Sequence, residues 1–597
     1  MKDFLKYMFA TMTGIIILSI IGGIIFVIML MGMLAGSDTK VKARENSVFV
    51  LKMNGMVSER AEDMSPLTAI LGAANMDNMG LDDILTAIRR ARDEDNIKGI
   101  YIEGGTTTFD SPATAQQIRN ALADFKKSGK WIIAYGDQIT QACYYVCSVA
   151  DSLFLNQTGM IDFKGLGGKN YYLTGLYEQL GVEYQVARVG RYKSYVESVT
   201  RKDMSEADRE QRQAYIDGIW KIWLDEMAQS RGVTAQQLDS VASDSIMVFA
   251  SVDDYLTAHL IDRAMYPDQV QNIIRQKLDI DADKKINQLM LSDMLNLKTK
   301  KERQKGGEVA VYYAYGEIVD ELSGALNTDH SIVGTSTVRE LQALADDKDV
   351  KAVVIRVNSG GGSAIASEQI WHTIKQLDAR KPVVISMGGV AASGGYMISS
   401  GARYIMAEPT TITGSIGIFG LVPNMSKLVT DKLGVTWDGV TTNRYTDYDT
   451  DLVFGSNNSD EMHFLQTYTD RGYENFLGIV ADGRGISKDS VHQIAQGRVW
   501  LATDALNIGL VDQLGSLDDA VAKAAEMAEL NEYHTCAYPG KVDWIEQLLN
   551  SEQRPDTYLD LQLRYALGDL YEPVKQLRLD QHRNRLQARL PFSVWVR

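Results

Sequence analysis

The sequence KPVVISMGGVAASGGY at Lys381–Tyr396 is matched by KWIIAYGDQITQACYY at Lys130–Tyr145, 251 positions earlier. Both stretches start with a lysine and an apolar, β-branched run and continue through a turn into a helix-like segment. Further matches follow in the same order at offsets of 250 to 255, among them LGVEY at Leu180–Tyr184 and LGVTW at Leu433–Trp437. Offsets that drift by a few residues indicate two long copies with small insertions and exclude a solenoid of short period.

Within each copy, short β-branched runs alternate with stretches of helical periodicity. The second copy reads VKAVVIRVN at Val350–Asn358, then SEQIWHTIKQLDA at Ser367–Ala379, then KPVVISM. This alternation predicts βαβ units around a largely parallel sheet, which is the α/β fold class. We expect five parts along the chain: a membrane anchor at 1–45, the first copy at 46–296, a charged linker at 297–307, the second copy at 308–545 and a helical extension at 546–597.

The N-terminal region contains an apolar stretch long enough to span a bilayer. No charged residue occurs from Tyr7 to Ser37, a span of 31 positions, and a transmembrane helix needs about 20 apolar residues. A cleaved secretory signal has a shorter apolar core of about 7–15 residues, so a retained anchor is the better interpretation. Two lysines before the stretch favour a cytoplasmic N-terminus and a body outside the cytoplasm, although three basic residues after it weaken that argument.

The composition argues against several functional classes. The formal charge is −16, from 61 basic and 77 acidic residues, so binding to nucleic acid is not expected. Three cysteines in a chain of 597 residues cannot form a disulfide framework. No two of the seven histidines lie within five residues of each other, so the chain has no local zinc signature such as H-E-x-x-H. We expect no metal or nucleotide cofactor.

The second copy has two glycine-rich turns, each after a β-branched run. One reads NSGGGS at Asn358–Ser363, and the other reads GGVAASGG at Gly388–Gly395. Neither is a Walker loop, because no GK[ST] follows, and neither has G-x-S-x-G spacing. Ligands of open α/β sheets bind beyond the carboxyl ends of the strands, where such turns lie. Two backbone N–H groups aimed at one point from these turns would form an oxyanion hole.

Ser393 lies between small residues at the predicted start of a helix, where a serine is most often an N-cap. The comparison of the two copies favours a different interpretation. At the matching position the first copy has Ala142, followed by Cys143 and Tyr144 where the second copy has two glycines. Glycines needed only for packing would be needed in both copies. The second copy therefore carries a feature that the first copy lacks.

A serine nucleophile needs a base. His372 is the only histidine near either turn, and its place within SEQIWHTIKQL indicates a helix residue that is at least partly exposed. A lysine can serve instead if burial lowers its pKa toward neutrality. Lys193 lies in VGRYKSYVES at Val189–Ser198, and the matching position of the second copy is Thr446. One copy thus has the lysine without the serine and the other the serine without the lysine, but spacing alone does not single out Lys193.

Four elements, occurring together and in order, resemble the signal peptide peptidase A family, the protease IV of bacterial inner membranes, in its long tandem-repeat form. They are RVGRYKSYVES at Arg188–Ser198, RVNSGGGS at Arg356–Ser363, SMGGVAASGGYMIS at Ser386–Ser399 and TGSIGIFG at Thr413–Gly420. The resemblance covers nearly the whole chain. It implies two tandem repeats of the Clp/crotonase-like fold behind one transmembrane helix. It also implies a bowl-shaped homotetramer with the active sites inside.

The resemblance also implies roles for individual residues. These are Ser393 as nucleophile, Lys193 as general base, Ser415 as the group that orients the lysine, and the backbone N–H groups of Gly362 and Gly394 as the oxyanion hole. The chain departs from the family at Gly360, where the family usually has proline. Proline would pre-set the turn, so glycine is expected to loosen it without changing the chemistry.

The function implied by the resemblance is a membrane-anchored serine endopeptidase that degrades cleaved signal peptides. Its single-pass anchor would lie in the bacterial inner membrane, with the catalytic body on the periplasmic side. The substrate peptide is expected to bind extended, as a strand added beside the loop at 358–362. Two alternatives stay open, namely an acyl-CoA enzyme of the crotonase type and a catalytically inactive scaffold for membrane proteins. A thiol nucleophile at Cys143, one helical turn from Cys147, is a further possibility that no histidine supports.

Overall fold

The computed structural model describes residues 41–61, 78–244, 247–298, 306–321, 330–540 and 586–589, together with six isolated residues before position 41. Most of the anchor expected at 1–45 therefore lies outside the described residues. No helix formed by the described residues is both long enough and apolar enough to cross a membrane.

The first copy is built around a parallel sheet with covered faces. Its strands run in the order β2-β1-β3-β4-β5-β7, with β8 added beside β1. All of these pairings are parallel. Phe49 and Leu51 enter one buried cluster and Val48 and Val50 another, so the sheet is buried on both faces. The strands are β1 Ser47–Ser58, β2 Asn78–Gly80, β3 Ile97–Phe109, β4 Trp131–Ile139, β5 Ser152–Ile161, β7 Arg263–Ala264 and β8 Asn287–Leu289.

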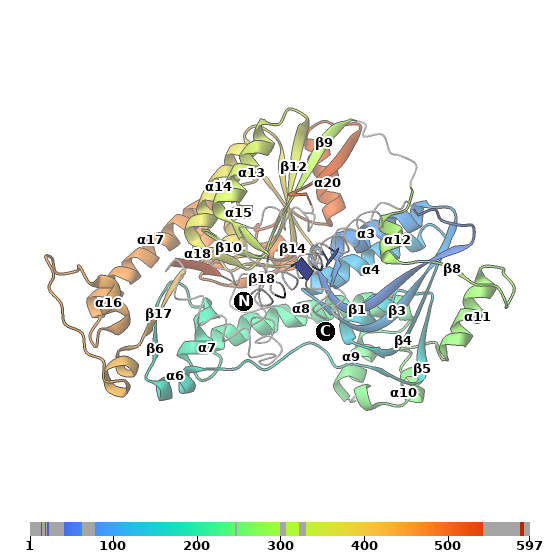
Figure 1. The fold of residues 1–597 in the computed structure, drawn as a ribbon, viewed down its shortest axis with the longest axis horizontal. Coiled ribbons are helices and arrows are strands. Elements are labelled where there is room, and N and C mark those ends of the chain that lie inside the picture. The colour runs from blue at the N-terminus through green and yellow to red at the C-terminus, as the bar shows by residue number, and fades with distance from the viewer. Residues whose placement is uncertain are drawn as a thin grey trace.

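Helices cover both faces of this sheet (Figure 1), with α3 and α4 on one face and α11 on the other. Local sequence signals fix where the helices begin. Ser111 caps α4 by accepting a hydrogen bond from the Thr114 N–H, and Pro112 occupies its first turn. The helices are α3 Leu81–Asp93, α4 Pro112–Lys126, α5 Gln141–Cys147, α6 Thr174–Leu180, α7 Glu197–Thr200, α8 Glu206–Arg231, α9 Ala235–Asp244, α10 Val252–Thr257, α11 Pro267–Lys277 and α12 Leu291–Leu295.

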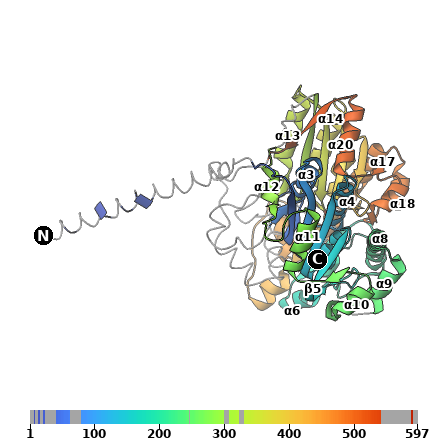
Figure 2. The ribbon, with the colours of Figure 1, turned by 90° about the vertical axis from the view of Figure 1, so that its right-hand side faces the viewer.

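The second copy repeats this plan. Its sheet has the order β18-β16-β14-β12-β9-β20, and β15 pairs with β14 while β19 pairs with β15. Among its described strands, only the β16–β18 pairing is antiparallel. Helices α13 and α14 pack on one face and α20 on the other (Figure 2). The strands are β9 Gly307–Tyr315, β12 Val350–Ser359, β14 Val383–Ala392, β15 Tyr404–Ala407, β16 Ile412–Gly414, β18 Val499–Leu501, β19 Gln513–Leu514 and β20 Tyr533–Tyr538. The helices are α13 Gly334–Asp346, α14 Ala364–Asp378, α15 Gly394–Ser399, α16 Tyr448–Phe454, α17 Ser459–Arg484, α18 Lys488–Ile494, α19 Ala502–Asn507 and α20 Leu517–Met527.

The fold shifts the alignment of the two copies by one residue at the start of α5 and α15. The hydroxyl of Tyr144 donates to the Leu260 carbonyl at 3.0 Å, as the hydroxyl of Tyr396 donates to the Leu510 carbonyl at 2.9 Å. Tyr144, and not Tyr145, is thus the counterpart of Tyr396. Counting back from this tyrosine, the residue opposite Ser393 is Gln141 and not Ala142, whereas the N-cap position that Ser393 holds in α15 is held by Thr140 in α5.

A third sheet joins the two copies and contains the C-terminal segment. Its order is β11-β10-β13-β21-β17-β6. In Figure 1, β6 and α7 of the first copy lie at the lower left beside β17, while the first sheet lies at the right. The strands are β6 Glu183–Arg188, β10 Glu317–Val319, β11 Ser331–Val333, β13 Gly361–Ser363, β17 Phe419–Asn424 and β21 Leu586–Arg589.

The C-terminal extension differs from the helix expected at 546–597. Its described part, Leu586–Arg589, is the strand β21, because β13 and β17 present backbone edges on its two sides and it pairs antiparallel with both. The rest of the extension lies outside the described residues.

A buried charged network fastens the second copy to the first. The guanidinium of Arg356 on β12 pairs with the Glu59 carboxylate, with Nε 2.7 Å from Oε1, and both side chains are almost fully buried. Arg356 Nη2 also donates to Gln117 Oε1 on α4 at 3.0 Å. Burial raises the pKa of the neighbouring Asp110 carboxyl to about 7, with the Glu59 charge adding to the effect. The interface between the copies therefore includes a specific polar contact, in addition to the apolar side chains of the second copy, such as Ile412 and Leu501, that enter the core of the first copy.

Candidate active site

The structure brings Lys193 and Ser393 into direct contact although 200 positions separate them in the chain. The Nζ atom of Lys193 lies 2.7 Å from Ser393 Oγ. The same Nζ donates to the backbone carbonyl and to the Oγ of Ser415, both at 3.0 Å. All three side chains are 0 % exposed. The three candidate side chains thus form one enclosed cluster contributed by a single chain.

The pairing of β6 with β17 carries Lys193 from the first copy to the second. The two strands run antiparallel, with Arg188 opposite Phe419, and the chain then turns toward the site. Gly190 has φ of 103° and packs so closely on Gln496 that a Cβ there would lie 2.4 Å from the Gln496 carbonyl carbon. The Tyr192 N–H donates to the Gln496 carbonyl at 3.0 Å. Only glycine permits both this backbone angle and this approach.

Two polar residues of α8 hold the lysine-bearing loop in place, and the sequence analysis did not identify them. Gln211 Nε2 donates to the Tyr192 carbonyl at 3.1 Å, and the Ser194 hydroxyl donates to Asp208 Oδ1 at 2.5 Å. The Val499 N–H in turn donates to Gln211 Oε1 at 3.1 Å. Asp208 and Gln211 are three positions apart on one face of α8, and both are buried. In the sequence, the two residues continue the i, i+3, i+4 spacing of the apolar stripe of this helix, and polar residues within such a stripe are the signal that could have identified them.

Ser393 occupies the N-cap position of α15 but does not act as a cap. Its side chain makes no capping hydrogen bond, and its backbone has φ 55° and ψ −115°. A non-glycine residue in this region is strained, and such strain is found where a side chain must be presented in one direction. The Ser393 N–H donates to the Gly414 carbonyl at 2.8 Å, which ties the turn to β16. The interpretation of Ser393 as a simple helix cap is therefore wrong.

Burial controls the protonation of the lysine. Loss of hydration lowers the pKa of Lys193 well below its ordinary value of 10.5. A neutral amine has two N–H donors and one lone pair. The two donors match the carbonyl and hydroxyl oxygens of Ser415, and the lone pair is left for the Ser393 hydroxyl proton. The cluster can therefore take a proton from Ser393, which is what general-base activation of a nucleophile requires.

The glycine loop lies next to the turn that carries Ser393. Gly361 has φ of 96°, and a Cβ there would lie 2.6 Å from the Gly394 nitrogen. The Gly361 N–H already donates to Ser359 Oγ at 3.1 Å. The N–H groups of Gly362 and Gly394 are then the candidates for holding an oxyanion. Gly361 and Gly362 both need glycine, since a Cβ on Gly362 would lie 2.0 Å from the Ile318 carbonyl oxygen. Gly360, where the family usually has proline, has no positive φ.

The other nucleophile and base candidates lie elsewhere. His372 is exposed on α14, where its Nε2 lies 3.0 Å from Nε2 of Gln376 in the same helix. Cys143 and Cys147 are fully buried in α5, with their Sγ atoms 4.0 Å apart. The structure therefore does not place these three residues with Ser393.

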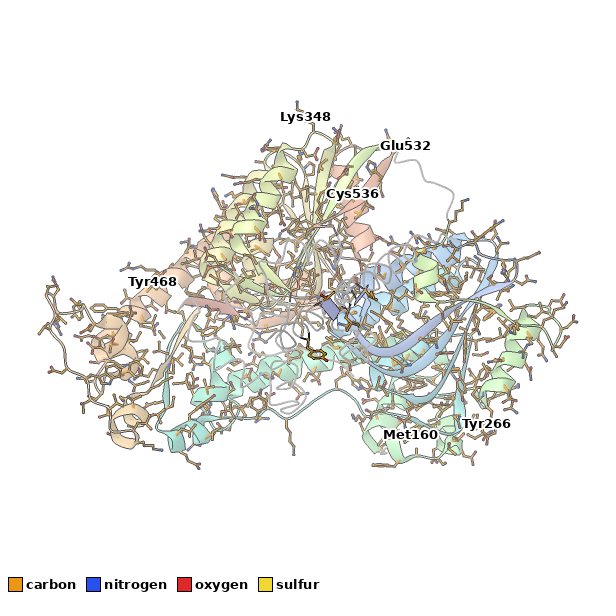
Figure 3. All side chains as sticks on the ribbon, viewed as in Figure 1. Met160, Tyr266, Lys348, Tyr468, Glu532 and Cys536 are labelled. Carbon is orange, nitrogen blue, oxygen red and sulfur yellow. The ribbon has the colours of Figure 1, made fainter. Side chains whose placement is uncertain are left out.

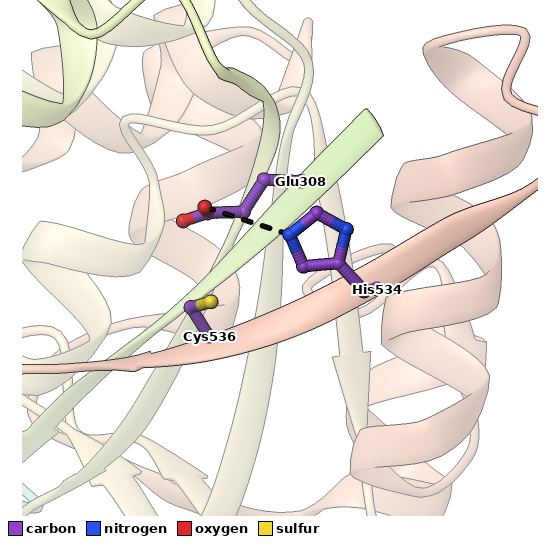
Figure 4. Close-up of side chains that lie close together, drawn as sticks. All are labelled: Glu308, His534 and Cys536. Carbon is purple, nitrogen blue, oxygen red and sulfur yellow. Dashed lines mark ion pairs between the residues drawn. The ribbon is translucent and has the colours of Figure 1, made fainter. Parts of the chain in front are cut away.

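Among the described residues, one group of three side chains is arranged so that it could hold a metal ion. Glu308 on β9 and His534 and Cys536 on β20 place their ligand atoms within 4.8 Å of one another. Figure 3 labels Cys536 on the second copy, and Figure 4 shows the Glu308–His534 pair, with Oε2 and Nε2 3.8 Å apart. Strands β9 and β20 lie at the end of the sheet order that is farthest from β16 and β18, so this cluster belongs to a different part of the sheet from the contact between Lys193 and Ser393.

Comparison with known proteins shows the family to which the chain belongs. The model of peptidase family S49 matches residues 124–281 and 375–531, one segment in each copy, and the Clp protease model matches 315–412. Protease 4 of Salmonella typhi is 34 % identical over 526 residues, covering 86 % of this chain and 84 % of its own. Protease 4 of Haemophilus influenzae is 33 % identical, covering 88 % and 86 %. The chloroplastic serine protease SPPA of Arabidopsis thaliana is 28 % identical, covering 82 % and 70 %. The chain therefore belongs to peptidase family S49 and is a serine protease of the protease 4 (SppA) type with two tandem copies.

Proposed function

We propose that this protein is a membrane-anchored serine endopeptidase with Ser393 as nucleophile and Lys193 as general base. Its substrates are the signal peptides left in the bacterial inner membrane after preprotein processing. The observation that carries the proposal is the 2.7 Å contact between Lys193 Nζ and Ser393 Oγ in a fully enclosed site. A buried lysine without a carboxylate partner is held neutral, and a neutral amine touching a hydroxyl is arranged for proton transfer.

The reaction then proceeds in two halves. Lys193 accepts the Ser393 hydroxyl proton while Oγ attacks a peptide carbonyl carbon, and the N–H groups of Gly362 and Gly394 bind the oxyanion. The Lys193 ammonium gives its proton to the departing amine, which leaves an ester on Ser393. Water, deprotonated by the same lysine, hydrolyses the ester. Ser415 keeps the amine aimed at Ser393 through both of its oxygens.

The proposed location of the enzyme rests on the sequence, and its proposed assembly rests on the family resemblance. The 31 uncharged positions from Tyr7 to Ser37 serve as a single-pass anchor in the inner membrane. The two copies lie on the periplasmic side and assemble as a homotetramer. An enzyme anchored in this way meets peptides that are themselves embedded in the bilayer, which suits apolar substrates. Protease protection of membrane vesicles, with and without detergent, tests the orientation.

The decisive experiment is hydrolysis of an apolar fluorogenic peptide ester by the detergent-solubilised protein. Ser393→Ala and Lys193→Ala are each expected to lower kcat by about 10³-fold or more, because each removes an indispensable group. Ser128→Ala and Lys277→Ala are matched controls at exposed positions of the first copy and should keep full activity. Equal activity in all variants would refute the dyad. A folded parent with no turnover would favour the inactive scaffold instead.

A further inference from the structure

Three side chains on strands β9 and β20 present metal-ligand atoms on one face of the sheet. The register places His534 directly opposite Glu308 and Cys536 opposite Ala310. Because successive side chains of a strand point to opposite faces, His534 and Cys536 share a face. Along β20 the side chains of this face are half-buried, and those between them are exposed. The ligand atoms of the three residues all lie within 4.8 Å of one another.

The Glu308 carboxylate is oriented by a hydrogen bond from outside the group of three. The Tyr538 hydroxyl donates to Glu308 Oε1 at 2.7 Å. The other oxygen, Oε2, faces the imidazole of His534 and lies 3.8 Å from its Nε2 (Figure 4). Carboxylates that bind metals are themselves hydrogen-bonded in this way, because the outer partner fixes which oxygen is presented. Tyr538 is therefore placed to orient a metal ligand.

The hydrogen bonds of the fold do not account for the imidazole of His534. Its Nδ1 atom is buried and has no hydrogen-bond partner among the described residues. Its Nε2 atom lies 3.8 Å from Glu308 Oε2, which is longer than a hydrogen bond. Buried polar atoms are nearly always hydrogen-bonded, so an imidazole left in this state beside a carboxylate and a thiol needs an explanation. A cation held between the three groups supplies one.

The chemistry and spacing of the three groups suit zinc. Thiolate, imidazole and carboxylate are the three kinds of side chain that bind Zn²⁺, whereas Mg²⁺ and Ca²⁺ select oxygen ligands. Donor atoms of a tetrahedral zinc site lie about 3.3–3.6 Å apart, given Zn–N and Zn–O bonds of about 2.0–2.2 Å and a Zn–S bond of about 2.3 Å. Small side-chain rotations bring the three atoms to these separations. The side chains of Glu308 and His534 are 13 % and 23 % exposed, so a hydrated ion can reach them.

We propose that Glu308, His534 and Cys536 bind one Zn²⁺ ion, with water as the fourth ligand. The Cys536 thiol gives up its proton to solvent when the Zn–S bond forms. No short motif reveals this site, because Glu308 precedes the other two ligands by more than 200 positions. The site uses none of the residues of the proposed dyad, so the two proposals are tested separately.

The ion would fasten an edge strand to the body of the second copy. Strand β20 ends the sheet order and pairs with β9. Directly after β20, the Pro539 carbonyl accepts a hydrogen bond from Arg60 Nη1 of the first copy at 2.8 Å. A zinc ion shared by β9 and β20 therefore stabilises a strand that also contacts the other copy. An ion that binds the folded state and not the unfolded chain raises the temperature of unfolding.

The test is titration of the full-length, detergent-solubilised protein with Co²⁺, without a histidine tag and under reducing conditions. Co²⁺ bound at a thiolate site gives a sulfur-to-cobalt charge-transfer band and the visible bands of tetrahedral cobalt. The parent is expected to show both at one equivalent, and Zn²⁺ should abolish them. Cys536→Ser should lose the charge-transfer band, and His534→Ala should lose the tetrahedral bands. The matched controls Cys147→Ala and His372→Ala should bind Co²⁺ like the parent.

A second variant keeps all three ligands. Tyr538→Phe removes the hydrogen bond to Glu308, so the affinity for Zn²⁺ should fall by about 10- to 100-fold while the charge-transfer band is retained. Zn²⁺ should raise the unfolding temperature of the parent and leave that of Cys536→Ser unchanged. Circular dichroism of each variant shows whether it is folded.

Four results would overturn the inference. A parent that binds no Co²⁺ has no such site. Cobalt bound without a charge-transfer band, or with the same band in Cys536→Ser, would place the ion on other groups of this acidic chain. An affinity for Zn²⁺ that is unchanged in Tyr538→Phe would contradict the assigned orientation of Glu308. Zinc that binds without raising the unfolding temperature of the parent would contradict the fastening of β20.

Discussion

Ser415 offers a sharp test of how the lysine is controlled. Its hydroxyl and its carbonyl each accept a hydrogen bond from Lys193 Nζ at 3.0 Å. Ser415→Ala removes the hydroxyl and leaves the carbonyl. Because Ser415 has φ of 49°, Ser415→Gly removes the same hydroxyl at a backbone angle that glycine adopts without strain. The two variants together separate the lost hydrogen bond from any change in backbone strain.

The size of the effect follows from the charge on the lysine. A hydrogen bond to a charged group contributes about 1.5–3 kcal/mol and one between neutral groups about 1 kcal/mol. Lys193 becomes an ammonium as Ser393 attacks, so removing the hydroxyl raises the barrier by the difference, about 1–2 kcal/mol. At tenfold per 1.36 kcal/mol, kcat should fall by about 5- to 30-fold in both variants. The hydroxyl also favours the ammonium, so its loss lowers the pKa of Lys193.

The assay is kcat and kcat/KM for the fluorogenic peptide ester across pH. We expect a lower plateau in both Ser415 variants and an acid limb displaced to lower pH. A loss as large as that of Lys193→Ala would contradict the reasoning, because it would make the hydroxyl itself part of the chemistry. Unchanged kinetics in both variants would contradict it as well, since the 3.0 Å contact would then contribute nothing.

Three further predictions concern the dyad, the glycine loop and the contact between the copies. Burial lowers the pKa of Lys193 and only the neutral amine accepts a proton, so kcat/KM of the parent should fall as pH decreases through that pKa. A value of kcat/KM that rises as the pH is lowered would be inconsistent with a lysine base. Gly361→Ala puts a Cβ on a residue with φ of 96° and 2.6 Å from the Gly394 nitrogen, so the loop must move and kcat should fall by about 10²-fold or more; an unchanged kcat would show that the loop is not part of the oxyanion site. Glu59→Gln leaves the Arg356 charge buried and unbalanced, so urea unfolding should show a free energy of unfolding lower by about 3–5 kcal/mol. The control Asp225→Asn breaks an exposed ion pair and should lower it by at most about 1 kcal/mol. Equal losses would refute the assigned role of the buried pair.

The sequence predicted those features of the fold that are local or repeated. The α/β architecture followed from the alternation of β-branched runs and helical periods, and the tandem organisation followed from offsets near 251. The sequence also singled out Ser393 in the second copy and Lys193 in the first copy, because neither residue occurs at the matching position of the other copy. The family resemblance was needed to choose Lys193 among the lysines. The contact between Lys193 and Ser393 depends on the antiparallel pairing of β6 with β17, two strands more than 200 positions apart. No local sequence pattern encodes this pairing.

There are physical reasons why other features of the site could not be predicted from the sequence. The strained backbone of Ser393 could not be predicted, because its φ of 55° goes with the tie to Gly414 and not with the helix that follows. The strand at Leu586–Arg589 gave no signal, because its conformation comes from two partner edges and not from its own composition. The sequence offsets misalign the two copies by one residue at Tyr144, because they cannot show which tyrosine hydroxyl donates a hydrogen bond to the equivalent backbone carbonyl.

The central claim is that buried, neutral Lys193 activates Ser393. The most direct measurement is the rate at which a peptidyl fluorophosphonate labels the detergent-solubilised protein, with the modified residue located by peptide mass mapping. The account predicts a single label on Ser393, a labelling rate that falls as pH decreases, and labelling slowed by about 10³-fold or more in Lys193→Ala while Lys277→Ala reacts like the parent. Labelling of Ser393 at the same rate in Lys193→Ala, or a label on another residue, would contradict the account.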